Sequence, residues 1–281
     1  MKHIIVSDSS CDIHTFENLA DNTAFSYAPL KIRIGEQEYV DNSDLDPGKM
    51  LEAMYAYQGA TSSACPSPDE WATQFRLADE VFAFTITSKL SGSYNSAVTA
   101  SDIVLEESPD KKICLIDTLS TGPEMVLLIQ KLNSFLKEGL DFDSICTKIR
   151  AYQQKTKLLF NLESLDNLVK NGRISKVAAM VANVLNIHVV GRASDEGALE
   201  LLHKCRGTRR SYACILKEMI QSGYSNGNVI ISHCQNELGA LALKEKIMEA
   251  FENADITIQT TGGLCSYYAE RHGMLVGYEV I

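Results

Sequence analysis

The chain is short of basic residues and of long apolar stretches. It has 26 lysines and arginines against 36 aspartates and glutamates, which gives a formal net charge of -10. Nucleic acid and anionic membrane surfaces need a dominant positive field, so neither is expected as the main partner. No apolar run approaches the roughly 18 residues of a membrane span, and charge interrupts the N-terminal apolar stretch too early for a signal peptide. We therefore expect a cytoplasmic protein without a membrane span.

Motifs for metal, redox and nucleotide chemistry are also missing. The eight cysteines form no Cys-x-x-Cys pair, and several lie in apolar runs, as reduced core residues do. The six histidines form no ligand-spaced cluster, so no metal site is expected. The chain lacks Gly-x-Gly-x-x-Gly after its first strand, Gly-x-x-x-x-Gly-Lys-Ser/Thr and Gly-x-Ser-x-Gly. These absences favour ligand binding over turnover and predict no cofactor.

Short apolar runs alternate with segments of helical character along the first half of the chain. Proline at the first helical position predicts helices beginning at Pro47 and Pro68, the second with a capping box of Ser67 and Glu70. A short helical stretch is expected through Phe16 and Leu19. The predicted strands include residues 3–7, 81–86 and 112–116, and a further helix spans about 123–137. Such alternation predicts an α/β fold with a mainly parallel sheet flanked by helices.

Hydroxyl side chains gather in four loops or strand ends. Because loops after parallel strands share one edge of the sheet, these clusters are expected to converge on one pocket. Gly92 allows close backbone approach, and Ser91 and Ser93 lie at a helix start, where an anion is favoured. The alternative is that Ser93 merely caps the helix. The four clusters are residues 7–10, 61–63, 87–93 and 118–121.

The second half predicts another α/β domain. We place the first domain, with the hydroxyl-rich ligand-head loops, at residues 1–158, and the second, which lines the tail and carries a basic patch, at 159–281. The apolar segment 177–185 predicts a helix that either packs as plain core or, with Met180 and Met125, lines a ligand wall. Residues 157–161 are taken as the passage into the second domain. Further strands are expected at 187–190, 198–205, 228–232, 256–260 and 275–280, with an amphipathic helix at about 237–251.

Two other features invite a functional interpretation. His233, after a predicted strand, is the best general-base candidate, although a histidine satisfied by its neighbours at a strand end is the simpler interpretation. Basic residues cluster within an otherwise acidic chain, as an interaction face for an acidic or phosphate-bearing partner would, unless they are scattered solvated charge. The cluster comprises Arg173, Lys176, Arg192, Lys204, Arg206, Arg209 and Arg210.

Five segments, in order along the chain, are similar to motifs of one family. They are Ser7-Asp-Ser-Ser10, Ser63-Ala-Cys-Pro-Ser-Pro68, Ser88-Lys-Leu-Ser-Gly-Ser-Tyr94, the run 165–176 with Asn171-Gly-Arg-Ile-Ser175, and His203-Lys-Cys-Arg-Gly207. The chain thereby resembles, over essentially its whole length, the DegV family of bacterial fatty-acid-binding proteins. That family includes the acyl-carrying subunit of bacterial fatty acid kinase. The resemblance implies two α/β domains with one long-chain fatty acid buried between them.

The resemblance also implies roles for individual residues. Ser63 and Ser91 would bind the carboxylate, with Gly92 supplying close backbone approach and Ser93 beside them. Arg173 and Arg206 match arginines associated with docking the kinase catalytic subunit. That separate ATP-dependent subunit would phosphorylate the carboxylate, so this chain would be a carrier and not an enzyme.

Two positions depart from the pattern of the family. Thr260 stands where the family often has a histidine that helps to hold the carboxylate, so Thr260 and Thr261 are the candidate ligands there. Cys65 replaces a glutamine in the proline-containing loop.

Burial of an acyl chain supplies enough free energy for tight binding without catalytic machinery. About sixteen carbons at roughly 0.8 kcal/mol per methylene give on the order of 10 kcal/mol, which exceeds the lower estimates of association costs. Serine and threonine hydroxyls with loop N–H groups would offset the cost of burying the carboxylate. The alternatives are a hydrolase or transferase that acts on a lipid-like substrate through Ser91 or His233, and a regulatory ligand sensor with a different partner.

Overall fold

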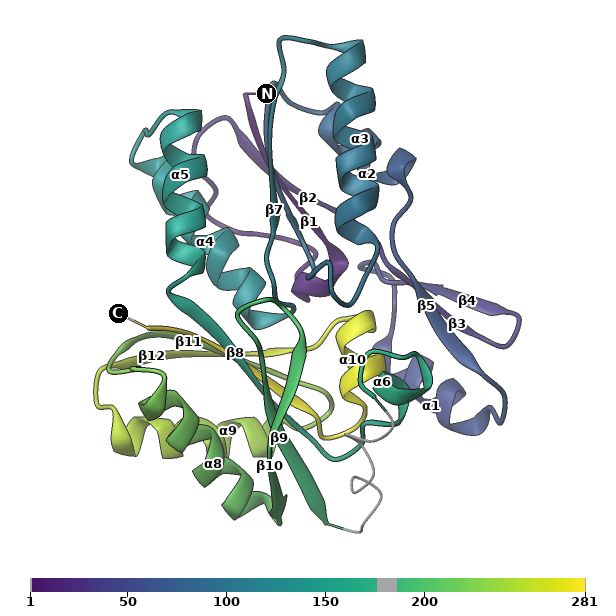
Figure 1. Cartoon of the computed structure of the whole chain (residues 1–281), viewed down its shortest axis with the longest axis vertical. Coiled ribbons are helices and arrows are strands. Elements are labelled where there is room, and N and C mark those ends of the chain that lie inside the picture. Colours follow the sequence, from purple (N-terminus) through teal and green to yellow (C-terminus); the bar gives the residue numbers. More distant parts are fainter. Residues whose placement is uncertain (1, 176–185, 281) are drawn as a thin grey trace.

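The computed structural model describes residues 2–175 and 186–280, and within them it contains three β-sheets (Figure 1). The first sheet has the strand order β2-β1-β6-β7, and every neighbouring pair in it is parallel. The predicted parallel sheet is therefore confirmed. Its strands are β1 (His3–Asp8), β2 (Thr23–Ala28), β6 (Glu80–Thr85) and β7 (Lys112–Asp117).

Helices cover both faces of the first sheet, which explains why β1 and β6 read as continuous apolar runs. In Figure 1, α2 (Pro68–Phe75) and α3 (Ser93–Glu107) lie on one face, and α4 (Pro123–Lys137) and α5 (Phe142–Gln153) on the other. Trp71 and Phe75 of α2 pack against the strand side chains on one face of the first sheet. Met125, Leu128 and Leu132 of α4 pack against the strand side chains on the other face.

Two predicted helix starts are confirmed by their capping bonds. Asp46 accepts hydrogen bonds from the backbone N–H groups of Gly48 and Lys49 and so caps α1 (Pro47–Ala56). Ser67 and Glu70 form the expected capping box at the start of α2. Both sites satisfy N–H groups that a helix start would otherwise leave unpaired.

The helix expected through Phe16 and Leu19 is wrong. The chain forms a single 3-10 turn, η1 (Ser9–Cys11), and then a loop. Asp12 and Asn18 have φ angles of 66° and 54°, and these left-handed conformations interrupt any continuous right-handed helix. Phe16 and Leu19 still pack against the core of the first sheet, which accounts for their apolar spacing.

A small antiparallel sheet has the order β4-β3-β5, with β3 (Lys31–Ile34), β4 (Gln37–Val40) and β5 (Thr61–Ala64). The predicted hydroxyl loop at 61–63 is thus an edge strand. Because side chains alternate along a strand, Thr61 and Ser63 share one face while Ser62 takes the other and is exposed.

The second sheet is mixed, with the order β10-β9-β8-β13-β11-β12, and only its β11 and β12 pair in parallel. The strands predicted from residue 187 onward are confirmed, and the segment expected as the passage into the second domain forms β8. Among its described residues, this part has the helices α6 (Asp166–Lys170), α8 (Thr208–Gln221), α9 (Glu237–Ala250) and the unpredicted α10 (Gly263–Ala269). The strands are β8 (Thr156–Leu162), β9 (Ile187–Ala193), β10 (Leu199–Arg206), β11 (Gly227–His233), β12 (Ala254–Thr260) and β13 (Met274–Glu279).

Helix α4 packs between the two large sheets and contacts both of them. Its Val126 and Leu127 pack against Ile230 of β11, while its other apolar face belongs to the core of the first sheet. A Cβ at Gly277 of β13 would lie 2.6 Å from the backbone nitrogen of Glu124, so glycine permits this close approach. The change from the first to the second sheet falls at β8, yet the domain division at residue 158 stays a prediction. The segment predicted as helix 177–185, together with Lys176, lies outside the described residues.

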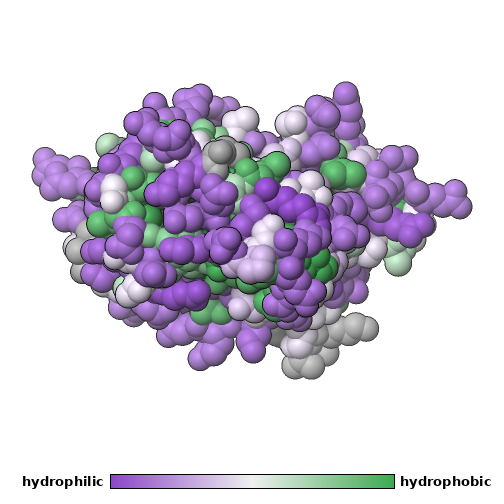
Figure 2. All heavy atoms as spheres, turned by 90° about the horizontal axis from the view of Figure 1, so that it is seen from above, coloured by the Kyte–Doolittle hydropathy of each residue, from purple (hydrophilic) through white to green (hydrophobic). Residues whose placement is uncertain are grey.

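The surface and the helices were compared with what a membrane-spanning protein shows. On the face shown in Figure 2, hydrophilic side chains predominate and hydrophobic ones form small groups. Among the helices that the structure describes, none has the length and apolar character that a membrane crossing needs.

Candidate ligand-binding site

A cavity of about 310 Å³ lies where loops of the first sheet, β5, α10 and one face of the second sheet meet. This volume is at the lower end of the range of roughly 300–1,000 Å³ that small-molecule sites occupy. The cavity is bounded by Leu30, Ser63, Ala64, Cys65, Ile86, Leu90, Ser91, Gly92, Thr121, Leu158, Phe160, Leu162, Leu168, Arg173, Leu199, Leu264, Cys265, Tyr268, Ala269 and Leu275.

Most of the cavity wall is apolar, and strands of the second sheet supply one side of it. Leu158, Phe160 and Leu162 of β8 lie two residues apart, so all three project from one face of the strand. Leu199 of β10 and Leu275 of β13 join them. The alternation of apolar residues along β8 can be seen in the sequence. Which other strands contribute to the same wall cannot be seen there. The wall offers no strong hydrogen-bond donors and suits an aliphatic chain.

Polar groups gather at one end of the cavity. The hydroxyls of Ser63 and Tyr268 are 2.7 Å apart. A Cβ on Gly92 would lie 3.3 Å from Cys65 Sγ, so the loop after β6 approaches the end of β5 closely. Arg173 completes this end, because its Nε donates to the backbone oxygen of Leu90 at 3.1 Å.

Ser91 lines the cavity, whereas the side chain of Ser93 does not. The Ser91 Oγ accepts a hydrogen bond from the Ser93 N–H at 3.2 Å, and the Ser93 hydroxyl donates to Asp8 Oδ2 at 2.6 Å. The expectation that Ser93 caps α3 is wrong, because Gly92 occupies the cap position and Ser93 is already helical. The hydroxyls of Ser91 and Ser93 therefore both have partners, and Ser91 is the one beside the cavity.

Asp8 is the buried carboxylate on which two of the hydroxyl clusters converge. It accepts hydrogen bonds from Ser10 Oγ at 2.5 Å, from Ser93 Oγ and from the backbone N–H of Ile86. Burial raises its pKa to about 6, although these donors oppose the shift. Of the four predicted clusters, three contribute cavity residues, namely Ser63, Ser91 and Thr121, and the cluster at 7–10 does not.

Thr260 and Thr261 do not line the cavity. Thr260 is exposed at the end of β12, and the hydroxyl of Thr261 lies 2.7 Å from Ser266 Oγ. The run that follows forms α10 and contributes Leu264, Cys265 and Tyr268 to the cavity instead.

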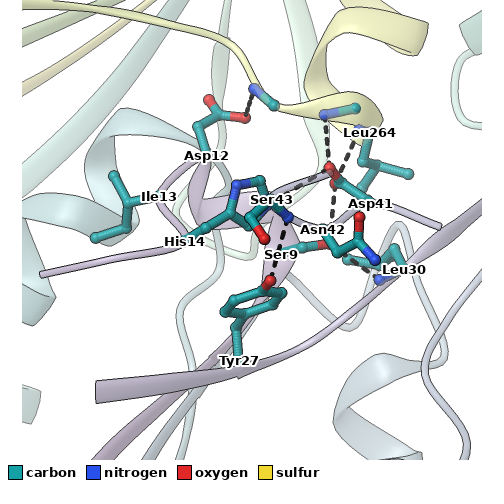
Figure 3. Close-up of polar contacts among 12 residues, drawn as sticks. Ser9, Asp12, Ile13, His14, Tyr27, Leu30, Asp41, Asn42, Ser43 and Leu264 are labelled. Carbon is teal, nitrogen blue, oxygen red and sulfur yellow. Dashed lines mark hydrogen bonds and ion pairs between the residues drawn. The ribbon is translucent and has the colours of Figure 1, made fainter. Parts of the chain in front are cut away.

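Two buried carboxylates hold the beginning of α10 (Figure 3). Asp12 accepts from the Gly262 N–H at 2.8 Å, and Asp41 accepts from the N–H groups of Gly263 and Leu264 at 2.7 and 3.0 Å. The Ser9 hydroxyl also donates to Asp41. Burial raises the pKa of Asp12 to about 7 and raises that of Asp41 as well. These bonds place α10, and with it one wall of the cavity, against the first half of the chain.

His233 and Ser91 are not brought together as a base and a nucleophile. His233 Nδ1 accepts from the backbone N–H of Asn236 at 3.2 Å, and His233 is not among the residues that line the cavity. Burial lowers the pKa of His233. In the two described ranges, no group of three histidine, cysteine or acidic side chains is placed to hold a metal ion.

The two predicted docking arginines lie in different surroundings. Arg173 borders the cavity, and its guanidinium also donates to the backbone oxygen of Asn171. Arg206 is exposed at the end of β10, immediately before α8. Within the predicted basic cluster, Arg192 is paired with Glu200 at 2.7 Å.

Sequence reasoning missed Tyr268 and the leucines that form the wall. Tyr268 lies in a helix that the sequence pattern did not reveal, because α10 is only seven residues long and mostly buried. Leu199 and Leu275 fall in predicted strands, but nothing in the spacing of the leucines shows which face meets a ligand.

The fold and the cavity define an α/β protein with a mostly apolar ligand pocket that has a polar end. The model of the family described as "Uncharacterised protein, DegV family" matches residues 2–278. The DegV domain-containing protein spr0652 of Streptococcus pneumoniae is 48% identical over 276 residues, which are 98% of each chain. This chain therefore belongs to the DegV family.

Solved structures agree with this assignment. The Streptococcus pneumoniae Fatty Acid Kinase (Fak) B3 protein, loaded with linoleic acid, has a TM-score of 0.98 and 47% identity over the whole of both chains. A DegV family protein from Eubacterium eligens, loaded with heptadecanoic acid, has a TM-score of 0.96 and 39% identity, covering 99% of this chain and 100% of its own.

Proposed function

We propose that this protein binds one long-chain fatty acid and presents the carboxylate to a separate ATP-dependent kinase subunit in the cytoplasm. The observation that carries the proposal is the cavity, whose leucine-lined wall ends at Ser63, Ser91 and Arg173. An apolar body with a polar end matches an amphiphile that has one anionic head group. The fatty acids bound by the two similar structures support this ligand class.

Energetics favour retention of such a ligand. Burial of roughly sixteen carbons stabilises the complex by on the order of 10 kcal/mol before the costs of association. The hydroxyl and guanidinium groups at the polar end offset the cost of removing a carboxylate from water. This ligand therefore needs no metal or other cofactor.

The second half of the proposal is the kinase partner. Its support is the strong similarity to a protein named as a fatty acid kinase B3 protein. Exposed Arg206 lies beside Arg209 and Arg210, both also exposed, at the start of α8. These three cations would attract an acidic surface. In this scheme the chain is a carrier and the partner supplies the catalysis.

Native mass spectrometry of the purified full-length protein, followed by organic extraction, tests the proposal. We expect one fatty acid per chain, and the extract identifies its length and unsaturation. Delipidated protein should take up added hexadecanoic acid at one molecule per chain. Protein that carries no fatty acid and also fails to bind the added one would contradict the proposal.

A further inference from the structure

Two adjacent tyrosines of α10 face β5, and they are bonded differently. The Tyr267 hydroxyl lies 2.6 Å from Thr61 Oγ1 and accepts from Asn171 Nδ2 at 2.9 Å. Tyr267 is completely buried and does not border the cavity. The Tyr268 hydroxyl lies 2.7 Å from Ser63 Oγ, and both of these residues border the cavity. Tyr267 thus fastens α10 to its neighbours, while Tyr268 reaches the ligand space.

The pairing of Ser63 with Tyr268 leaves one donor available. Each hydroxyl carries one hydrogen, and a single bond between the two oxygens uses one of them. The other hydrogen belongs to a hydroxyl that is already accepting a bond, which makes it a stronger donor. An acceptor at the polar end of the cavity is the group that would use it.

The electrostatic surroundings favour an anionic acceptor. Burial raises the pKa of Tyr268 above its ordinary value near 10, so the phenol keeps its proton at neutral pH and acts as a donor. The Arg173 guanidinium borders the same cavity and acts on the Tyr268 hydroxyl electrostatically. A carboxylate there would meet one cation and neutral donors.

The phenol ring is held in place before any ligand arrives. The rings of Tyr267 and Tyr268 pack edge to face, with centroids 4.8 Å apart and an interplanar angle of 75°. The backbone N–H groups of Gly262 and Gly263 donate to Asp12 and Asp41 and fix the start of the same helix. Little side-chain entropy is therefore lost when the hydroxyl binds a ligand.

We propose that Tyr268 is a head-group ligand, whose hydroxyl accepts the hydrogen bond from Ser63 and donates its own hydrogen to a carboxylate oxygen of the bound fatty acid. This inference rests on the proposed function and deepens it by assigning a ligand residue from α10. It also explains how the C-terminal segment contributes to the head-group site although Thr260 and Thr261 do not line the cavity.

The test compares Tyr268→Phe with its matched control Tyr267→Phe in delipidated full-length protein. The probes are hexadecanoic acid and its methyl ester, with affinities measured by titration and folding checked by thermal unfolding. We expect Tyr268→Phe to weaken binding of the acid by about tenfold to a hundredfold, the range for a lost hydrogen bond to a charged group. Binding of the uncharged ester should change by less than about threefold, and Tyr267→Phe should keep the affinity for the acid.

The outcomes separate the two proposals. If the unsubstituted protein binds neither probe, the proposed function and this inference both fail. If it binds the acid and Tyr268→Phe binds it equally well, or loses acid and ester alike, only this inference fails. Should Tyr268→Phe not fold, a crystal structure of the unsubstituted protein loaded with hexadecanoic acid decides. There, Tyr268 Oη within about 3.0 Å of a carboxylate oxygen supports the inference, and a carboxylate bound elsewhere overturns it.

Discussion

Asp41 accepts a hydrogen bond of 2.7 Å from the backbone N–H of Gly263, across a sequence separation of 222 residues. With the bonds from Leu264 to Asp41 and from Gly262 to Asp12, it satisfies three successive N–H groups at the start of α10 (Figure 3). A helix begins with N–H groups that lack partners within the helix, and here acidic side chains from the first half of the chain supply them. The wall of the cavity that α10 forms therefore depends on residues near the N-terminus.

Asp41→Ala should lower the free energy of unfolding by about 2–4 kcal/mol. The substitution leaves the Gly263 and Leu264 N–H groups and the Ser9 hydroxyl without an acceptor, and each buried unpaired group costs roughly 1–3 kcal/mol. Relief of the buried carboxylate offsets part of this cost. Chemical denaturation measures the change, and Asp44→Ala is the exposed control with an expected change within about 0.5 kcal/mol. Equal effects of the two substitutions would contradict the anchoring role.

Stability should fall as pH rises from about 4 to about 7. Burial raises the pKa of Asp8 to about 6 and of Asp12 and Glu124 to about 7. In this window the folded protein holds more protons than the unfolded chain, so the free energy of unfolding decreases with increasing pH until the folded pKa is passed. Through Asp8, Asp12 and Glu124, the free energy of unfolding is therefore higher near pH 5 than near pH 7.

Asp12→Asn isolates one of these groups, because asparagine does not titrate and tolerates the left-handed φ of 66° at this position. Relative to the unsubstituted protein, the variant should gain on the order of 1 kcal/mol of stability for each pH unit between about 5 and 7. Urea denaturation at several pH values measures the slope. Exposed Asp21→Asn serves as the control and should leave the slope unchanged. Parallel curves for Asp12→Asn and the parent would show that Asp12 does not titrate in this range.

Leu199→Trp should weaken binding of hexadecanoic acid by at least tenfold, because the larger side chain occupies part of a cavity of about 310 Å³. Leu201→Trp is the matched control. Leu201 lies two residues further along β10 and packs against the same core, but it is not among the residues that border the cavity. Isothermal titration with delipidated protein gives both affinities. If the two variants bind hexadecanoic acid equally well, the ligand does not occupy the part of the cavity beside Leu199.

Under the proposed function, Arg206→Glu should reduce acyl-phosphate formation with the proposed kinase subunit by tenfold or more. It should leave fatty-acid affinity unchanged, because Arg206 is exposed and outside the cavity. A charge reversal at Arg173 cannot separate partner coupling from fatty-acid binding. Arg173 borders the cavity, so the reversal should weaken ligand binding as well. Lys137→Glu, at the exposed end of α4, controls for the change in net charge. Equal loss of coupling in both variants would indicate a general charge effect.

Much of the secondary structure could be predicted, because its signals are local. Proline with a capping aspartate or serine placed α1 and α2, and the run from Pro123 to Lys137 matches α4 at both ends. The failures have equally local causes. Left-handed residues at Asp12 and Asn18 replaced an expected helix with a loop, and the short α10 gave no periodic signal.

The sequence by itself determined the α/β alternation, the hydroxyl-rich strand ends and the lack of cofactor motifs, because each of these depends on residue types close together in the chain. Only the tertiary structure decided which hydroxyls face the cavity. Ser93 turns to Asp8 across 85 residues, and Ser63 pairs with Tyr268 across 205. A hydroxyl binds the nearest competing acceptor that folding brings to it, and that acceptor cannot be read from the local sequence.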